Sequence, residues 1–309
     1  MLAPPGAKPS DRLASQPPVC RGGRRYPQLM AYFRYDGQRL AYTVHGKGAR
    51  VTVLMPGLLL SQKMQTPLAR HLARRGNRVV TLDPLGHGGS DRPRDMWRYS
   101  MSAFAQQAVA LLDHLELEQA IVGGTSLGAN ITLEVASLAP ERLKGMIIEM
   151  PVLDNAIPAC AAAFTPLLFA LTFGAPVMRV AARGARAVPR DRVPFLVELG
   201  LDAISQDPAP GGAVLQGIIF GRTAPNRAER RTFGAPALVI GHPRDPIHPF
   251  SDADMLAAEL PNARLIDANS IIELRTHPAR LEARIDQFID DCWSEEAVGP
   301  AQRAAGAGS

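Results

Sequence analysis

The residues best suited to chemistry in this chain lie at positions 124–128, which read Gly-Thr-Ser-Leu-Gly. A short β-type run at residues 120–122 leads into this segment, and a helix-compatible run begins at Leu127. In a strand-turn-helix of this kind, glycines two positions before and after the serine remove Cβ atoms that would collide at the turn. Ser126 is therefore the candidate nucleophile. The alternative is a glycine-rich turn whose serine only caps the helix.

The turn also predicts where negative charge could be stabilised. Ser126 would be held at the carboxyl end of a sheet, and the amide of Leu127 would lie at a helix N-terminus, where an oxyanion could form. A serine hydroxyl is a poor nucleophile until its position and a base activate it. The elements around the turn must therefore supply a base.

Strands and helices alternate through most of the chain. Apolar runs bounded by turn residues predict strands at 51–55, 78–82, 120–122, 143–150, 236–241 and 263–267. Helical spacing predicts helices at 62–75 and 102–115, and a last helix that has Pro278 in its first turn and carries Leu281 to Cys292. Such alternation implies a mostly parallel sheet covered by helices on both faces. Residues 29–35 and 39–45 alternate apolar and polar side chains around Asp36-Gly37, so we expect an antiparallel hairpin at the sheet's edge.

The interval from residue 151 to residue 231 breaks this rhythm. It is too long for a plain connection, so we expect an inserted helical lid between two core segments, 27–150 and 232–294. Residues 155–178 are uncharged, but Pro158, Pro166, Gly174 and Pro176 interrupt them. We expect this run to line an apolar pocket, with Phe164 and Leu168 toward the substrate, rather than to span a membrane. Loose association with a membrane through this lid stays open.

Composition narrows the classes of protein. The 309 residues are 46% hydrophobic and carry a formal charge of +5, which suits a globular protein. The arginines are scattered, so no nucleic-acid partner is expected. The three cysteines and seven histidines show no metal-ligand spacing, so we expect no metal or cofactor and a reduced, cytoplasmic protein. Residues 1–26 and 295–309 read as a disordered leader and tail.

Four segments together resemble the α/β-hydrolase fold family, from about residue 29 to residue 293. They are residues 124–128, residues 82–93 (Leu-Asp-Pro-Leu-Gly-His-Gly-Gly-Ser-Asp-Arg-Pro), residues 55–58 (Met-Pro-Gly-Leu) and residues 241–249 (Gly-His-Pro-Arg-Asp-Pro-Ile-His-Pro). The resemblance implies an α/β fold with a mostly parallel central sheet, helices on both faces and an inserted helical lid.

The resemblance also implies roles for individual residues. Ser126 matches the nucleophile, and Leu58 and Leu127 match the residues whose backbone amides form the oxyanion hole. Asp245 matches the acid that orients a histidine, although an aspartate before a proline is also common in turns. Asp154 and Glu149 are alternative acids, after the preceding strand.

The chain departs from the family at the base. The resemblance places the histidine on the loop after the last strand, at a position that Ile271 occupies here. His277, directly before Pro278, lies on the same loop, so we take it as the candidate base. His248 and His242 are near Asp245 in sequence, but relatives use such positions structurally. His87 is expected to hold its loop together. Met55 stands where relatives often carry a histidine that braces the oxyanion loop.

The function that these expectations favour is that of a serine hydrolase similar to carboxylesterases. It would cleave an ester, thioester or related acyl bond of an apolar small molecule through an acyl-enzyme on Ser126. Serine instead of aspartate argues against epoxide hydrolase and haloalkane dehalogenase chemistry. Because Ile271 removes the usual base, a ligand-binding or non-hydrolytic protein of this fold is the alternative. Hydrolysis of a C–C bond in a diketone is a third, and it too needs a histidine.

Overall fold

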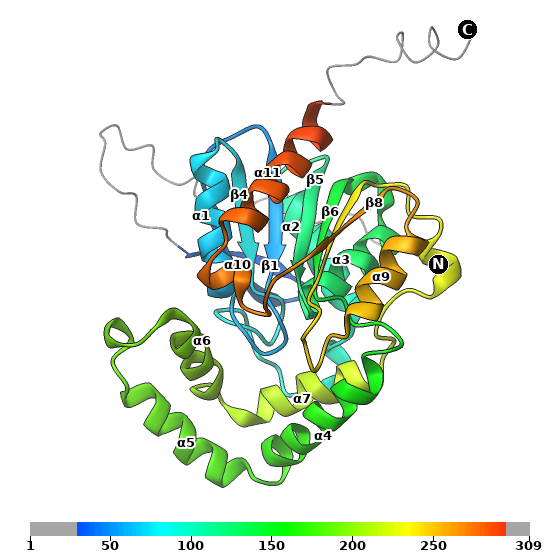
Figure 1. The fold of residues 1–309 in the computed structure, drawn as a ribbon. Coiled ribbons are helices and arrows are strands. Elements are labelled where there is room, and N and C mark those ends of the chain that lie inside the picture. Colours follow the sequence, from blue (N-terminus) through cyan, green and yellow to red (C-terminus); the bar gives the residue numbers. More distant parts are fainter. Residues whose placement is uncertain (1–29, 295–309) are drawn as a thin grey trace, which may run out of the picture.

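The structure, a computed structural model, describes residues 30–294 and contains an eight-stranded sheet (Figure 1). The order is β1-β2-β4-β3-β5-β6-β7-β8, and only the pairs β1–β2 and β2–β4 are antiparallel. The strands are β1 (Met30–Tyr35), β2 (Gln38–His45), β3 (Val51–Met55), β4 (Arg78–Leu82), β5 (Ala120–Thr125), β6 (Leu143–Glu149), β7 (Ala237–Gly241) and β8 (Ala263–Asp267). The predicted mostly parallel sheet is confirmed.

The expected hairpin at the sheet's edge is present. Asp36 and Gly37 both have positive φ angles, 46° and 72°, as a two-residue hairpin turn with the twist of the flanking strands requires. Tyr35 pairs with Gln38 across this turn, and the register continues to Met30 opposite Thr43.

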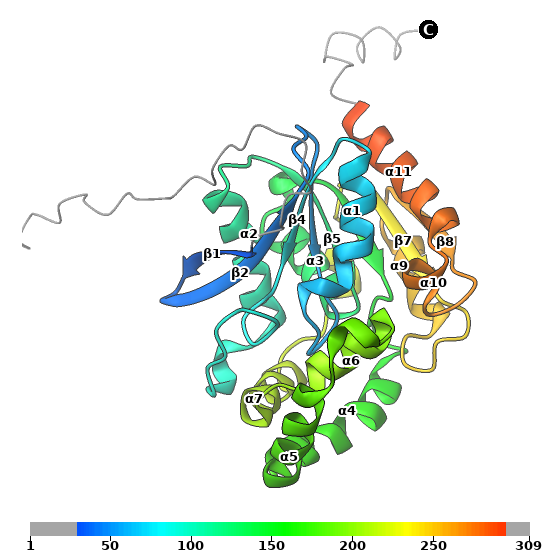
Figure 2. The same ribbon diagram turned by 90° about the vertical axis from the view of Figure 1, so that its left-hand side faces the viewer.

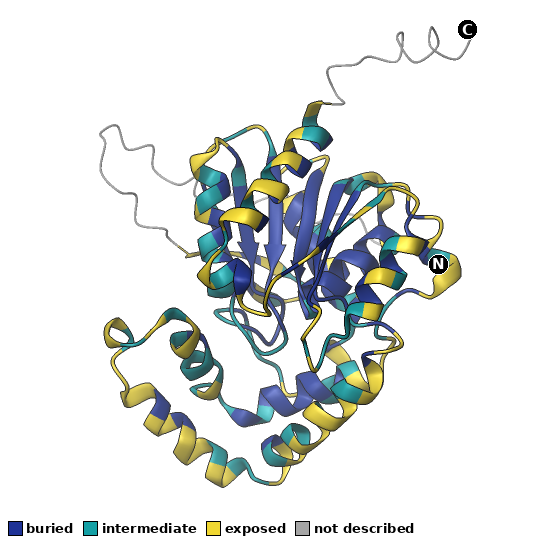
Figure 3. Ribbon diagram, in the orientation of Figure 1, coloured by how far each residue is buried: buried dark blue, intermediate teal, exposed yellow. Residues whose placement is uncertain are grey.

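Helices cover both faces of the sheet (Figure 2). One face packs against α2 (Met101–His114), α3 (Leu127–Leu138) and α9 (Phe250–Glu259), and the other against α1 (Thr66–Arg74) and α11 (Ala279–Ser294). The alternation of side chains along β3 shows why both faces are apolar. Val53 belongs to the first core and Leu54 to the second, and both are fully buried. The strands therefore lie inside, between two helical layers (Figure 3).

One predicted helix is divided. Residues 62–75 form a short 3-10 helix, η1 (Gln62–Gln65), followed by α1, because Pro67 suits the first turn of a new helix. The strands at 51–55, 78–82 and 263–267 have the predicted bounds, and the helix predicted at 102–115 begins and ends one residue earlier as α2.

Between β6 and β7 the chain leaves the sheet and forms a set of helices. They are α4 (Ile157–Thr172), α5 (Ala175–Ala187), α6 (Phe195–Ile204), α7 (Pro208–Ile219) and the short α8 (Arg227–Arg230). Elsewhere in the chain, η2 (Met96–Arg98) precedes α2, and α10 (Glu273–Thr276) follows β8. We call α4 to α7 the helical insertion. It lies beyond the carboxyl ends of the parallel strands (Figure 1). Among residues 30–294 no single helix is long and apolar enough to cross a membrane, whereas α4 and α5 meet that test as a pair bent by 95°.

Asp252 on α9 fixes the point where the insertion leaves the core. Its buried carboxylate accepts hydrogen bonds from the amides of Leu153, Asn155 and Ala156, at 2.7, 3.0 and 3.0 Å. Because these amides precede α4, this one side chain sets where the helix starts. The leader and tail predicted at 1–26 and 295–309 lie outside the described residues.

Candidate active site

Ser126 lies at a sharp turn between β5 and α3, as the sequence predicts. Its backbone has φ 54° and ψ −106°, a conformation that is strained for any residue with a Cβ. The two glycines explain how this turn fits. A Cβ on Gly124 would lie 2.6 Å from the carbonyl oxygen of Met55, and one on Gly128 would lie 2.4 Å from the same atom. Only glycine therefore lets β3 and the turn approach so closely.

A chain of three side chains runs through Ser126. His248 Nε2 lies 2.9 Å from Ser126 Oγ, and His248 Nδ1 lies 2.9 Å from Asp245 Oδ2. With Nδ1–H donating to the carboxylate, Nε2 is left to accept the hydrogen bond of the Ser126 hydroxyl. This is the geometry by which a base activates a serine and an acid orients the base.

The loop after β7 holds the acid and the histidine together. Asp245 Oδ1 accepts hydrogen bonds from the amides of Ile247 and His248, at 2.8 and 3.0 Å, while Oδ2 accepts from the imidazole. Burial alone would raise the pKa of Asp245, but these bonds to His248 and Ile247 lower it below its usual value. Asp245 is therefore kept ionised beside the ring.

The prediction that His277 would provide the base is wrong as to position. His277 is exposed at the end of α10, and its Nδ1 lies 3.1 Å from the hydroxyl of its neighbour Thr276. Ile271 is also exposed, at 43%. The loop after the last strand thus turns these two side chains to the surface, and the ring that contacts Ser126 comes from the preceding loop. The sequence signal was the i, i+3 spacing of Asp245 and His248 around a proline.

The segment after β8, where the resemblance predicts a histidine, contributes an arginine instead. Arg275 forms a buried ion pair with Glu149 at the end of β6 and donates to Thr125 Oγ1 at 2.7 Å. Burial would raise the pKa of Glu149, but Arg275 and His242 hold it at about 2. Glu149, an alternative acid in the sequence prediction, is therefore committed to Arg275, directly behind the nucleophile turn.

The other predicted alternatives lie elsewhere. Asp154 is exposed in the turn before α4. His242 is buried with Nδ1 3.0 Å from the carbonyl oxygen of Ser270 and Nε2 3.5 Å from Glu149. His87 is buried with Nδ1 3.0 Å from the carbonyl oxygen of Leu85, so it holds its loop as expected. Each of these histidines has a structural partner.

The segment at residues 56–58 is fixed against the nucleophile turn by bonds that sequence reasoning missed. The amide of Gly128 donates to Pro56 O at 3.1 Å, and buried Gln65 donates to Met55 O at 2.8 Å and to Thr125 Oγ1 at 3.0 Å. Gln65 thus braces this loop although Met55 replaces the expected histidine. Leu58 and Leu127, the predicted oxyanion residues, both line the cavity at Ser126.

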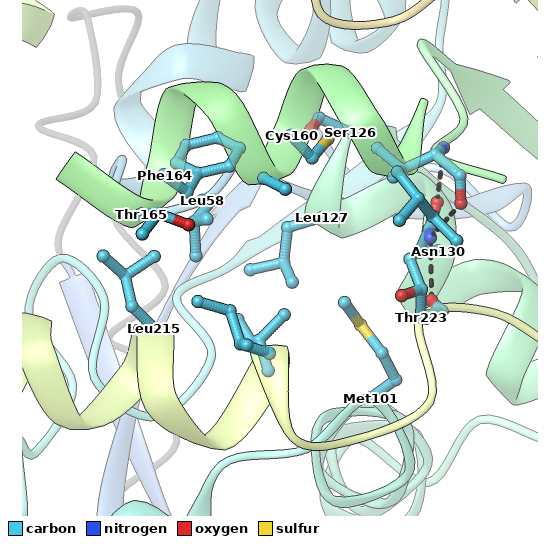
Figure 4. A pocket seen from close by; sticks show the side chains of 15 residues that line it. Leu58, Met101, Ser126, Leu127, Asn130, Cys160, Phe164, Thr165, Leu215 and Thr223 are labelled. Carbon is cyan, nitrogen blue, oxygen red and sulfur yellow. Dashed lines mark hydrogen bonds between the residues drawn. The ribbon is translucent and has the colours of Figure 1, made fainter. Parts of the chain in front are cut away.

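An apolar cavity of about 190 Å³ opens at Ser126, between the sheet and the helical insertion (Figure 4). Phe164 from α4 and Leu215 from α7 form opposite walls, whereas Leu168 is not among the described residues that line it. Asn130 also faces the cavity, but its amide is used by Val152 and Thr223, to which it donates at 2.8 Å each. The cavity therefore offers apolar contacts and the Ser126 hydroxyl.

Cys160 from α4 also lines the cavity (Figure 4). Burial, with smaller contributions from Asp252 and Asp245, raises the pKa of its thiol to about 11. A thiol that stays protonated at neutral pH is a weak nucleophile. Ser126, with an imidazole at 2.9 Å, is the better candidate in this cavity.

Comparison with known proteins agrees with the fold. The model of the family described as "alpha/beta hydrolase fold" matches residues 51–169. An enol-lactonase from Burkholderia xenovorans LB400 has a TM-score of 0.68 at 21% identity, covering 84% of this chain and 99% of that one. A hydrolase from Pseudomonas aeruginosa PA01 has a TM-score of 0.67 at 22% identity, covering 84% and 98%.

A curated relative is similar over a shorter stretch. The 2-hydroxymuconate semialdehyde hydrolase of Pseudomonas sp. (strain CF600) is 33% identical over 105 residues, which are 34% of this chain and 34% of that protein. The chain thus matches about a third of the length of this relative. The sheet and these matches together show that the chain has the α/β-hydrolase fold.

Proposed function

We propose that this protein is a serine hydrolase that cleaves an ester, thioester or related acyl bond through an acyl-enzyme on Ser126. The observation that carries the proposal is the chain of hydrogen bonds from Ser126 through His248 to Asp245. His248 takes the hydroxyl proton as Ser126 attacks the acyl carbon, and Asp245 stabilises the imidazolium that forms. The same imidazolium then returns the proton to the leaving group.

The charge that develops on the acyl oxygen needs donors. Leu58 and Leu127 line the cavity together with Ser126, and Leu127 is the first residue of α3, where a helix N-terminus favours negative charge. We propose these two amides as the oxyanion hole. After the leaving group departs, water activated by His248 releases the acyl group and restores Ser126.

The cavity supports an apolar substrate, because its walls are formed mainly by side chains such as Phe164, Leu215 and Ile218. The names of the similar proteins include a lactonase and a hydrolase, which agrees with acyl chemistry in this fold. The position of His248 also removes the main support for a non-hydrolytic protein, which rested on Ile271 at the expected site of the base.

The test is labelling with a fluorophosphonate probe, with the modified peptide mapped by mass spectrometry. We expect rapid labelling of Ser126 in the unaltered protein, none in Ser126→Ala and strongly slowed labelling in His248→Ala. Cys160→Ala is the matched control in the same cavity and should label normally. Absence of labelling in the folded, unaltered protein would refute an activated serine.

A further inference from the structure

The outer side of the helical insertion carries an apolar surface that the catalytic cavity does not use. Phe169 and Phe173 on and after α4 are 57% and 75% exposed, and Val177 and Val180 on α5 are 72% and 63% exposed. We call these four residues the α4–α5 elbow. The two phenylalanine rings stack at 5.6 Å, so the surface is a joined patch and not a set of scattered side chains.

The elbow lies where the chain bends between the two helices. The axes of α4 and α5 meet at 95° near Gly174, at the rim of the molecule farthest from the sheet (Figure 1). Exposed residues follow this rim along both helices (Figure 3). The buried residues Leu171 and Ala182 are on the inner side, so the apolar outer side is not needed to pack the insertion.

Positive charge lies on α5 next to the elbow, beside buried Ala182. Arg179, Arg183 and Arg186 share one face of α5 at helical spacing and are exposed. The chain has no acidic residue between Asp154 and Asp191. Asp207 lies beside these arginines but forms an ion pair with Arg94 at 3.3 Å. The surface therefore combines exposed aromatic and aliphatic side chains with an excess of positive charge.

We propose that the α4–α5 elbow docks on the surface of an anionic lipid bilayer. Apolar side chains of a bent helix pair can enter the boundary between head groups and acyl chains, while arginines beside them contact lipid phosphates. A second copy of the chain fits less well, because two such surfaces would bring their arginines together. The charge of the patch thus selects an anionic partner.

The elbow and the cavity lie on opposite sides of α4. Phe164 and Ala161 on the inner side of α4 line the cavity, and Phe169 and Phe173 follow on its outer side. Ile219 of α7 also lines the cavity, and its neighbour Phe220 is 75% exposed. Docking would therefore place the cavity beside the bilayer. This part rests on the proposed hydrolase function and gives the substrate class as an acyl compound that partitions into lipid.

The test is sedimentation of the full chain with vesicles of phosphatidylcholine alone or of phosphatidylcholine and phosphatidylglycerol in equal parts. We expect binding only to the phosphatidylglycerol vesicles, weaker at high salt. Phe169→Ser/Phe173→Ser should lose at least about tenfold in affinity. Arg179→Gln/Arg183→Gln should lose about fivefold for each arginine.

Matched controls separate docking from folding and from catalysis. Leu138→Ser and Arg74→Gln remove an exposed apolar and an exposed basic side chain at the far ends of α3 and α1, and should bind as the unaltered chain does. Circular dichroism melts check that every variant is folded. Ser126→Ala should bind vesicles normally, so that a failure of the hydrolase proposal would leave the docking result standing.

Three results would overturn the proposal. The first is equal binding to both kinds of vesicle. The second is an equal loss in Leu138→Ser and in the elbow variant Phe169→Ser/Phe173→Ser. The third is a lack of binding to either kind of vesicle together with self-association of the unaltered chain, measured by sedimentation velocity, that the same elbow variant loses. This result would assign the surface to a second copy of the chain.

Discussion

Asp245 and His248 lie three residues apart in one loop, and their side chains meet at 2.9 Å between Oδ2 and Nδ1. The acid also accepts the amide of His248, so the backbone and the ring of the same residue are both held by one carboxylate. The expected arrangement took the acid and the histidine from two different loops. Here the second loop, after β8, supplies Arg275 to Glu149 instead.

His248→Ala should lower kcat for a p-nitrophenyl ester by about 10³-fold or more, because Ser126 then lacks a base. His277→Ala, which removes an exposed ring, is the matched control and should leave kcat unchanged. Steady-state kinetics measure both. An inactive His277→Ala beside an active His248→Ala would reverse the assignment.

Asp245→Asn should lower kcat by as much as about 10⁴-fold while leaving the fold intact. The amide of asparagine can donate to Nδ1, which would place the ring proton on Nε2, facing Ser126. Asp254→Asn changes an exposed aspartate of the following helix and serves as the control. Comparable kcat values for the two variants would show that Asp245 does not orient the ring.

Gly128→Ala should destabilise the protein by about 1–3 kcal/mol, because its Cβ would lie 2.4 Å from Met55 O and must push the turn away from β3. Fluorophosphonate labelling of Ser126 should also slow, since the turn positions the hydroxyl. Gly200→Ala, in α6 with no atom within 4 Å of the added Cβ, should be neutral or stabilising. Urea unfolding gives the free energies, and equal values would contradict the packing argument.

Arg275→Met should cost about 3–5 kcal/mol of unfolding free energy, because it leaves the Glu149 carboxylate buried without its cation. Glu149→Gln/Arg275→Met removes both charges and should recover part of this loss. Urea unfolding of Arg275→Met, Glu149→Gln, the double variant and the unaltered protein measures the coupling. A double variant less stable than the sum of the single changes predicts would argue against the pair.

The stability of the protein should fall as the pH is lowered from 6.5 to 4, in part because of His87. Burial lowers the pKa of His87 from 6.5 to about 4, so the unfolded chain binds a proton in this range before the folded one does. The contribution of neutral His87 to the free energy of unfolding is fully present above pH 6.5 and is lost as the pH falls through 4. The loss is on the order of 3 kcal/mol.

His87→Gln should therefore show a shallower decrease in unfolding free energy over that range, measured by urea unfolding at several pH values. His277→Gln, which changes an exposed histidine, should follow the unaltered protein. The same slope in all three proteins would mean that His87 takes up its proton without unfolding.

The turn at Ser126 could be predicted from sequence because its signal is local. The strand, the two glycines and the helix around Ser126 are contiguous, and their backbone conformation follows from the residues themselves. The histidine that contacts Ser126 could not be predicted, because three histidines follow or flank Asp245 and only the fold decides which ring reaches the serine. The role of Gln65 could not be predicted for the same reason, because this glutamine in η1 bonds to Met55 and Thr125, ten and sixty residues away in the sequence.

The helices between β6 and β7 could be predicted, but not how they are arranged. Their uncharged composition predicted apolar helices, and Phe164 does line the cavity. The same composition hid which side of α4 would face inward, so Leu168 was placed at the substrate and Phe169 and Phe173 were not expected on the surface. The inward side depends on where α4 starts, which Asp252 fixes from a distant helix.

Asp245 and His248 share a four-residue segment, and in the described part of the chain one hydrogen bond, from His248 Nε2 to Ser126 Oγ, joins this segment to the nucleophile turn. A displacement of the loop after β7 would carry both side chains together and lengthen only one hydrogen bond, that to the serine. The reactivity of Ser126 would then depend on the distance between the loop after β7 and the serine. The segment after β8 is then held by a different demand, because its Arg275 must stay paired with Glu149.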